Sequence, residues 1–207
     1  MKKFTSAILA CGLLTAILIN NVCGFIRDGA ALEHLRSSVL RLHILADSDS
    51  DGDQWLKLKV RDAVIESGIL DGCTSLSDAQ ATASANLDRI EHIAEDTLRQ
   101  YGCTKPVKAC LTDMHFTERV YGELTMPAGD YKALRILIGN AQGHNWWCVM
   151  YPPLCLPAAC DVVDDEETAE KIFTEKENDI LYQPGKYRVR FAIWDKLCEL
   201  TSNDCAK

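Results

Sequence analysis

The sequence predicts an α+β fold: a single domain with a mixed, mostly antiparallel sheet covered by two to three helices, after an N-terminal signal segment. Two observations predict this class. The 207-residue chain is 47% hydrophobic and 25% charged, which is typical of a globular domain with its own core. Along the chain, apolar residues also change between alternation and helical spacing, and no internal repeat or linker is visible.

The N-terminal segment has the parts of a secretory signal. Lys2 and Lys3 precede an uncharged apolar stretch at residues 7–19, and small residues at 22–24 fit a cleavage after Gly24. The stretch is short for a membrane-spanning helix of about 20 residues. We therefore expect residues 1–24 to be a signal peptide or, if uncleaved, a membrane anchor. Residues 25–207 then form a single secreted α+β domain, Cys-rich from about residue 160.

The first half of this domain is predicted to be one strand followed by two helices. Residues 38–46 alternate with one aliphatic face, which indicates a strand. After an acidic turn at residues 47–53, apolar residues recur at helical spacing until Gly68 closes the helix. Ser77 and Gln80 fit a capping box for a second helix, which Gly102 ends. The buried stripe predicted for that helix is Ala83, Leu87, Ile90, Ala94, Leu98 and Tyr101.

The second half returns to alternation. Strands are predicted at residues 107–112, 115–121, 133–138 and 145–151. A turn of type I preference is expected at residues 126–129, a loop at 139–143, and Pro152-Pro153 stops the last of these strands. An acidic helix is expected at about residues 165–177, and residues 187–193 fit either a last strand or the start of a terminal helix.

The charge balance and the motifs exclude several classes of function. The chain has 22 Lys and Arg against 30 Asp and Glu, and no cluster of basic residues, which argues against nucleic-acid binding. It contains no G-x-S-x-G, H-E-x-x-H, phosphate-loop or dinucleotide-binding motif. We therefore expect neither an enzyme nor a cofactor.

The acidic turn resembles a calcium-binding loop in part. Its matches to positions one, three, five, six and seven are Asp47, Asp49, Asp51, Gly52 and Asp53. The glutamate required at position twelve is replaced by Leu58, and a strand rather than a helix precedes the turn. We favour a turn whose carboxylates stabilise the start of the following helix, over a weak cation site.

The chain has ten cysteines, of which eight follow the signal segment. Their even number in an exported protein is compatible with disulfides, although the sequence does not determine the pairing. His144, Cys148, Cys155 and Cys160 could form a zinc site, but the C-x2-C spacing of strong zinc motifs is absent. A disulfide among Cys148, Cys155 and Cys160 is favoured over zinc, and Cys148 with Cys155 is one possible pair. Cys148 with His144 could also be a thiol nucleophile and its base.

The aromatic segment at residues 143–155, GHNWWCVMYPPLC, is the most distinctive part of the sequence. Trp146 and Trp147 must point to opposite faces of a strand, so one of them could face outward as a partner-binding hot spot. The alternative is a sheet that is buried on both faces.

Three segments of the chain resemble the stage II sporulation protein R family of endospore-forming bacteria. They are residues 40–64, 118–139 and 143–155. Their order, the two helices between the first two segments and the N-terminal signal agree with the family. The resemblance covers most of the mature domain and is weakest after Cys160. Of the cysteines, only Cys148 and Cys155 belong to the shared motif.

The resemblance implies a secreted signalling protein that is made in the forespore and exported into the space between the forespore and mother-cell membranes. There it would activate a membrane-embedded aspartic protease that processes the precursor of the sigma-E factor. Such a ligand carries no catalytic residues, and it would act by stabilising the active state of its receptor. It would meet a membrane only through an uncleaved N-terminal segment.

We expect the receptor contacts in the aromatic segment and in a second, loop-borne set. The first set is Asn145, Trp146, Trp147, Tyr151, Pro152 and Pro153, and the second is Tyr121, Pro127, Gly129 and Tyr131. Two alternatives from other classes are an exported hydrolase that uses Cys148 with His144 and a disulfide-stapled structural protein of the cell envelope. The hydrolase requires a solvent-reactive thiol of low pKa.

Overall fold

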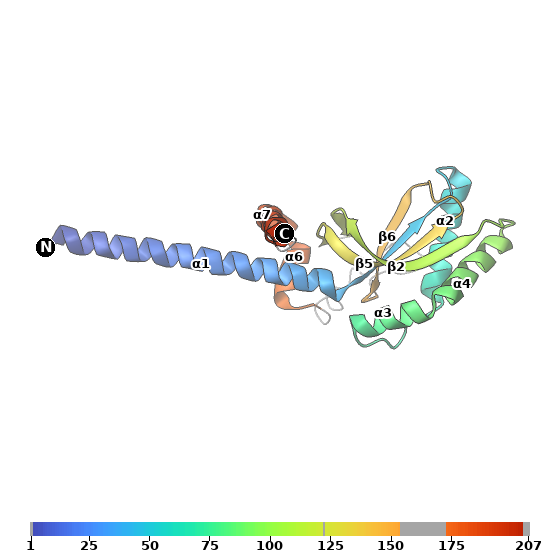
Figure 1. The fold of residues 1–207 in the computed structure, drawn as a ribbon, viewed down its shortest axis with the longest axis horizontal. Coiled ribbons are helices and arrows are strands. Elements are labelled where there is room, and N and C mark those ends of the chain that lie inside the picture. Colours follow the sequence, from blue (N-terminus) through green and yellow to red (C-terminus); the bar gives the residue numbers. More distant parts are fainter. Residues whose placement is uncertain (1, 122, 154–172, 205–207) are drawn as a thin grey trace. The chain divides into compact units, whose positions relative to one another are not determined.

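The computed structural model describes residues 2–121, 123–153 and 173–204 (Figure 1). It divides into two compact units, one of residues 1–35 with 173–207 and one of residues 36–172. The two units are described separately below. The predicted boundaries of a signal segment and a single domain of residues 25–207 stay predictions.

The described part of the unit of residues 36–172 is an α+β fold, as predicted. Its main sheet consists of β1 (Leu40–Leu45), β2 (Val107–Phe116), β5 (Gly129–Ile138) and β6 (Asn145–Tyr151). A separate hairpin consists of β3 (Arg119–Tyr121) and β4 (Leu124–Met126). The helices are α2 (Asp51–Glu66), α3 (Leu76–Ala85) and α4 (Leu87–Gln100).

The main sheet has the order β2-β5-β1-β6. β1 runs parallel to β5, from Leu40 opposite Lys132 to Leu45 opposite Leu137, whereas β2 and β6 each run antiparallel to their neighbours. The prediction of a mixed, mostly antiparallel sheet is therefore confirmed. Because β1 is a central strand, all six of its residues are buried, and β6 lies at one edge of the described sheet.

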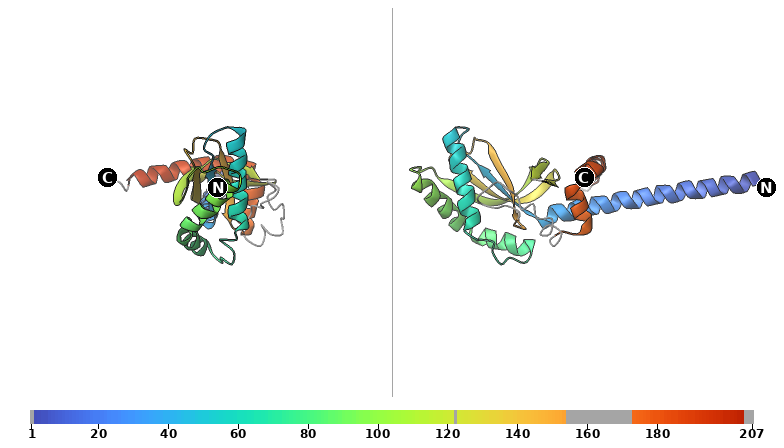
Figure 2. Two further views of the ribbon diagram at one scale, coloured as in Figure 1. Left: turned by 90° about the vertical axis from the view of Figure 1, so that its right-hand side faces the viewer. Right: turned by 180° about the vertical axis from the view of Figure 1, so that it is seen from behind.

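One face of the sheet is covered by helices (Figures 1 and 2). Leu42 and Ile44 of β1 point to this face and form a buried cluster with α2, α4 and β5. The other members of the cluster are Val60, Val64, Ile69, Ile90, Ala94, Leu98, Val107, Ala109, Leu134, Ile136, Ile138 and Cys148. Side chains at alternate positions, including Arg41 and His43, point to the opposite face, which we call the hairpin face because Tyr121 of β3 bonds to it.

The first predicted helix is confirmed as α2. Its N-cap is Ser50, whose side chain accepts a hydrogen bond from the Asp53 backbone, and Asp51 and Asp53 occupy its first turn. Gly68 follows the C-cap residue with a positive φ of 61°, a conformation that favours glycine. The acidic turn therefore begins a helix, as we favoured over a calcium loop.

The prediction of the second helix is wrong in two details: the segment forms two helices, and the first of them begins at a different N-cap residue. α3 begins at the N-cap Ser75, whose side chain accepts from the Asp78 backbone, and not at a capping box of Ser77 and Gln80. Asn86, with φ −111° and ψ 15°, then separates α3 from α4, and its side-chain amide donates to the Thr82 carbonyl at 2.8 Å.

The predicted stripe of the second helix is buried at Ala83, Ile90, Ala94 and Leu98, and Leu87 is partly buried. Tyr101 is 48% exposed and contacts the Trp55 ring, so its prediction as a core residue is wrong. Gly102 follows α4 with a φ of 74°, in agreement with its predicted role as the stop.

The strands of the second half are confirmed with corrected ends. The two strands predicted before residue 121 are one long β2 and the short β3, and residues 133–138 belong to the longer β5. Residues 139–143 form the predicted loop, and β6 has the predicted bounds. The predicted turn at residues 126–129 lies between β4 and β5.

The other unit is helical in its described residues. It contains α1 (Lys2–Ser38) up to residue 35, α6 (Glu175–Tyr182) and α7 (Pro184–Asp204). Residues 187–193 are thus the start of a terminal helix and not a strand. Most of the acidic helix predicted at about residues 165–177 lies outside the described residues, and α6 begins with a capping box formed by Thr174 and Glu177.

Helix α1 packs against α6 and α7 in its second half. Asp28 forms ion pairs with Lys176 of α6, at 2.6 Å, and with Arg190 of α7. Gly29 is required for the close approach of α7, since a Cβ there would lie 2.2 Å from the Trp194 ring. The segment of α1 from Cys11 to Ser38 is long and apolar enough to cross a membrane. Helix α1 continues through the predicted cleavage point at Gly24 without interruption.

Candidate functional site

Strand β6 presents its two adjacent tryptophans on opposite faces of the sheet, as predicted. Trp146 lies on the helix-covered face, where the Arg61 guanidinium of α2 is 4.4 Å from its ring centre. Trp147 lies on the hairpin face, where the Arg119 guanidinium of β3 is 5.0 Å from its ring centre. Each ring is half-buried and has an arginine over it, an arrangement that favours cation–π attraction.

Trp147 is supported by an aromatic cluster on the hairpin face. Its ring centre is 4.5 Å from that of Phe116, at a nearly perpendicular angle of 86°, and 5.1 Å from that of His43. Phe116 in turn contacts the Tyr131 ring at 5.7 Å. Edge-to-face contacts of this kind fix ring orientation, so the position of Trp147 is set by buried neighbours from three strands.

Arg41 joins this cluster to the hairpin. Its side chain is fully buried, donates to the Cys148 carbonyl at 3.1 Å and donates to the Tyr121 hydroxyl at 2.8 Å. The Tyr121 hydroxyl in turn donates to the Trp147 carbonyl at 3.1 Å. A single chain of hydrogen bonds therefore connects β1, the hairpin and the edge strand β6.

The hairpin face holds buried positive charge. The Arg41 guanidinium lies 4.4 Å from the centre of the Phe116 ring and 5.1 Å from that of Tyr131, and no carboxylate among the described residues pairs with it. Burial, together with the nearby charge of Arg135, lowers the pKa of His43 to about 4, so His43 is neutral at pH 7. Burial also raises the pKa of the Tyr121 hydroxyl, against the opposing effect of Arg41.

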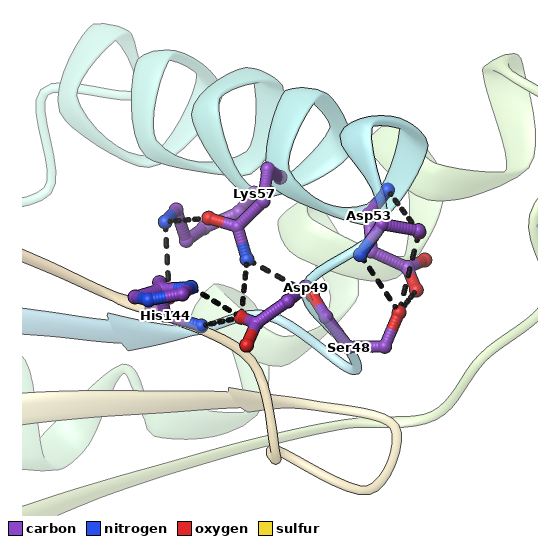
Figure 3. Close-up of polar contacts among 7 residues, drawn as sticks. Ser48, Asp49, Asp53, Lys57 and His144 are labelled. Atoms are coloured by element: carbon purple, nitrogen blue, oxygen red, sulfur yellow. Dashed lines mark hydrogen bonds and ion pairs between the residues drawn. The ribbon is translucent and has the colours of Figure 1, made fainter.

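The acidic turn holds the start of β6 in place (Figure 3). The Asp49 carboxylate accepts from the His144 backbone at 2.6 Å and pairs with the His144 ring at 2.5 Å. Lys57, which is 5% exposed, donates to the His144 carbonyl at 3.0 Å and to the Gln54 side chain at 2.6 Å. Burial lowers the pKa of Lys57, against the attraction of the Asp49 carboxylate. These contacts fix the residue just before Asn145.

Two further carboxylates of the turn, those of Asp47 and Asp53, are also satisfied by protein groups. Lys105 pairs with Asp47 at 2.7 Å and with Asp53 at 2.6 Å. Asp47 accepts from the Asn140 backbone, which is the main cause of its lowered pKa, and Lys105 and the Ser48 hydroxyl lower the pKa of Asp53. This arrangement fits a turn that links two loops and leaves no set of carboxylates directed at a common cation.

The predicted cysteine chemistry is only partly visible. Among the described residues no group of three or more His, Cys, Asp or Glu side chains could hold a metal ion, and Cys155 and Cys160 lie outside these residues. The Cys148–Cys155 disulfide therefore stays a prediction. Cys73, Cys103 and Cys110 are free thiols, so complete pairing of the eight cysteines is excluded. Cys148 is 2% exposed, which argues against a solvent-reactive nucleophile.

The predicted receptor contacts differ in exposure. Asn145 and Pro153 are exposed, and Trp146, Trp147, Tyr151 and Tyr121 are half-buried. Pro152, Pro127, Gly129 and Tyr131 are buried, and the Tyr131 hydroxyl donates to the Pro127 carbonyl at 2.7 Å. The structure brings Tyr121, Trp147 and Tyr131 together around Arg41. Their role in binding a partner stays a prediction.

Sequence reasoning missed two adjacent exposed residues of β3, of which Arg119 lies over Trp147. Arg119 is exposed, and Val120 is 68% exposed. Among the described residues of the unit of residues 36–172, which we call the main-sheet unit, the next most exposed large apolar side chain is Tyr101, at 48%. We call Arg119, Val120 and Trp147 the hairpin surface. Because β3 has only three residues, its alternation was too short to show which side chain faces outward.

The fold and this surface define a class of protein: an α+β domain behind an apolar N-terminal helix, with an aromatic edge strand and a hairpin whose Arg119 lies over Trp147. The family model of stage II sporulation protein R matches residues 36–161. Stage II sporulation protein R of Bacillus subtilis (strain 168) is 35% identical over 164 residues, which cover 75% of this chain and 71% of that protein. No solved structure matches the chain.

The chain therefore belongs to the stage II sporulation protein R family, as the resemblance of its three segments implied. A role in sporulation follows from this membership. The match begins at the first residue of the main-sheet unit, so it includes the hairpin surface, the Arg41 cluster and the acidic turn. The apolar N-terminal helix is consistent with an exported protein.

Proposed function

We propose that this chain is the exported activating ligand of a membrane-embedded aspartic protease, in the space between the forespore and the mother cell. Its binding stabilises the active state of the protease, which then processes the precursor of the sigma-E factor. Membership of the stage II sporulation protein R family and the apolar N-terminal helix support this proposal. A ligand of this kind acts through differential affinity for two receptor states and needs no catalytic group.

The observation that carries the proposal is the hairpin surface. The exposed Arg119 lies over the half-buried Trp147 and is followed along β3 by the exposed Val120. Aromatic and arginine side chains of this kind dominate the energy of protein interfaces. The cluster around Arg41 holds this surface rigid from beneath. A preorganised surface loses less conformational entropy on binding, which favours a specific partner.

Reconstitution in a non-sporulating bacterial host tests the function. The protease and the sigma-E precursor are co-expressed with the full chain, with a chain that lacks residues 2–24, or without any form of this chain. We expect precursor cleavage only when a form of the chain is exported. An intact precursor in the presence of the exported, folded chain, or equal cleavage without it, contradicts the proposal.

The Cys148–Cys155 disulfide is a separate part of the proposal. Peptide mass spectrometry of the exported chain, after blocking of free thiols, is expected to recover the two residues in one linked peptide. Free Cys73, Cys103 and Cys110 serve as the internal control, because they react with the blocking reagent. Recovery of a blocked Cys148 contradicts the disulfide.

A further inference from the structure

We propose that the unit formed by α1, α6 and α7 docks on an anionic membrane and binds the phosphodiester headgroup of a phospholipid. The site is a polar recess of about 500 Å3, lined by Asn20, Asn21, Gly24, Arg27, Asp28, Lys176 and Arg190. It lies beside the last turns of the apolar part of α1. The inference is independent of the proposed receptor.

Residues 8–26 of α1 include many exposed apolar side chains. Ile8, Leu9, Leu13, Leu14, Ile17, Leu18, Ile19, Val22 and Ile26 are each between 49% and 73% exposed. None of the described residues covers these large aliphatic side chains. The hydrocarbon core of a bilayer would cover them well. Lys2 and Lys3 before it favour a cytoplasmic N-terminus by the positive-inside rule.

The charges of the recess favour an anion. Its side chains include three cations, Arg27, Lys176 and Arg190, and one carboxylate, Asp28. Asp28 pairs with Lys176 and Arg190 and so holds them at the recess, but it balances only one positive charge. Arg27 is exposed and forms no ion pair with any described residue. A phosphodiester group would supply the missing negative charge and accept hydrogen bonds from the arginines.

Helix α7 adds a second membrane-facing feature. It runs across α1 rather than along it (Figures 1 and 2), so it would lie along a membrane surface that α1 enters. Val189, Ile193 and Leu197 are spaced four residues apart on one line of α7 and are 73%, 51% and 46% exposed. A line of exposed apolar side chains with basic residues nearby, here Lys186 and Lys196 among others, is compatible with a membrane interface.

The headgroup of a lipid fits the recess better than a free phosphate ion. The recess lies where the apolar surface of α1 ends, which is the depth of the headgroups in a bilayer. At the same level the Phe25 and Trp194 rings contact each other at 5.7 Å between their centres. Aromatic residues are enriched at this depth of membrane proteins.

Native mass spectrometry of the full chain in a mild detergent tests the recess. We expect phosphatidylglycerol to be retained at least ~10-fold more strongly than phosphatidylcholine, and Arg27→Gln to abolish this preference. Arg89→Gln is the matched control, because Arg89 is an exposed arginine on α4 in the other unit. Equal retention of the two lipids, or an unchanged preference in Arg27→Gln, overturns the proposal.

Two further arms separate the ligand source and the role of α7. If inorganic phosphate displaces phosphatidylglycerol as well as glycerophosphoglycerol does, the recess recognises free phosphate and the lipid assignment is wrong. In vesicles, phospholipids brominated near the headgroup are expected to quench the fluorescence of the full chain more than lipids brominated deep in the acyl chain. Trp194→Phe should remove most of this quenching. Equal quenching in Trp194→Phe would show that α7 does not lie at the interface.

Discussion

The two faces of the main sheet are stabilised in different ways. The helix-covered face is an aliphatic core, in which Leu42 and Ile44 pack with side chains of α2, α4 and β5. The hairpin face places a charged arginine and an imidazole, Arg41 and His43, at the alternate positions of the same strand. Both side chains are buried, and among the described residues one Nη atom of Arg41 has no hydrogen-bond partner. Burial of such groups costs free energy, so we expect the hairpin face to contribute less to the stability of the domain than the helix-covered face.

The difference indicates a division of labour within β1. The aliphatic side chains of the strand hold the domain together, and its polar side chains position the hairpin and Trp147. Variants on the two faces should therefore separate the stability of the domain from its activity.

The largest effect on stability is expected on the helix-covered face. Ile44→Ala leaves a cavity in a fully buried cluster and should lower the free energy of unfolding by about 2–5 kcal/mol. Urea denaturation followed by circular dichroism measures this change. A loss below about 1 kcal/mol would show that the aliphatic cluster is not the main core.

The next effect is a pH dependence on the hairpin face. The pKa of His43 is lowered from 6.5 to about 4, so the unfolded chain binds more protons than the folded chain between these values. The folded state should therefore lose about 3 kcal/mol as the pH falls from 6.5 to 4.

The His43→Phe variant removes this titration and keeps an aromatic ring beside Trp147. The unfolding free energy of this variant should fall less than that of the natural chain between pH 6.5 and pH 4. The difference between the two decreases should approach the value of about 3 kcal/mol expected from His43. Parallel curves for the two proteins would contradict the assignment of the lowered pKa to His43.

A smaller effect on stability is expected at Arg41. Arg41→Met removes two hydrogen bonds but also a buried charge, so the unfolding free energy should change by less than about 2 kcal/mol. The link to the hairpin is lost, and amide exchange at residues 119–126 should speed up at least ~10-fold. Unchanged exchange in the hairpin, measured by mass spectrometry, would show that Arg41 does not position it.

The smallest effect is expected in the acidic turn. Asp49→Asn removes an ion pair with His144 between two largely exposed side chains, and should cost at most about 1 kcal/mol. The melting temperature of the variant should also be as insensitive to calcium as that of the natural chain. A calcium-dependent rise in the natural chain that the variant lacks would restore the cation site.

Much of the fold was predictable because the pattern of each element is strong. The alternation in β1, the spacing of Val60 and Val64 in α2, and the positive-φ glycines at 68 and 102 each follow from local physics. The break at Asn86 was missed because apolar spacing continues from Ala83 to Ile90 across it, and only the backbone angles of Asn86 depart from the helix.

The site was less predictable than the fold. The opposite orientation of Trp146 and Trp147 follows from strand geometry, and the resemblance of three segments indicated the family. No pattern in the sequence shows that Arg41 is buried or that Arg119 lies over Trp147, because these contacts join strands that are far apart in the chain. The exposure of Tyr101 likewise depends on its contact with Trp55 of another helix.

The most direct test of the account compares two pairs of exposed residues, each with one cation that lies over a tryptophan ring, in the processing assay. On the hairpin surface, Arg119→Glu with Val120→Asp changes two adjacent exposed residues of β3, of which Arg119 lies over Trp147. The control is Lys59→Glu with Trp55→Asp on α2, where the lysine lies 5.3 Å from the centre of a ring that is 46% exposed. We expect both variants to fold and be exported, the hairpin variant to lose at least ~10-fold in precursor cleavage and the control to keep it. Full cleavage with the hairpin variant, or a loss confined to the control, would contradict the proposal that the hairpin surface binds the receptor.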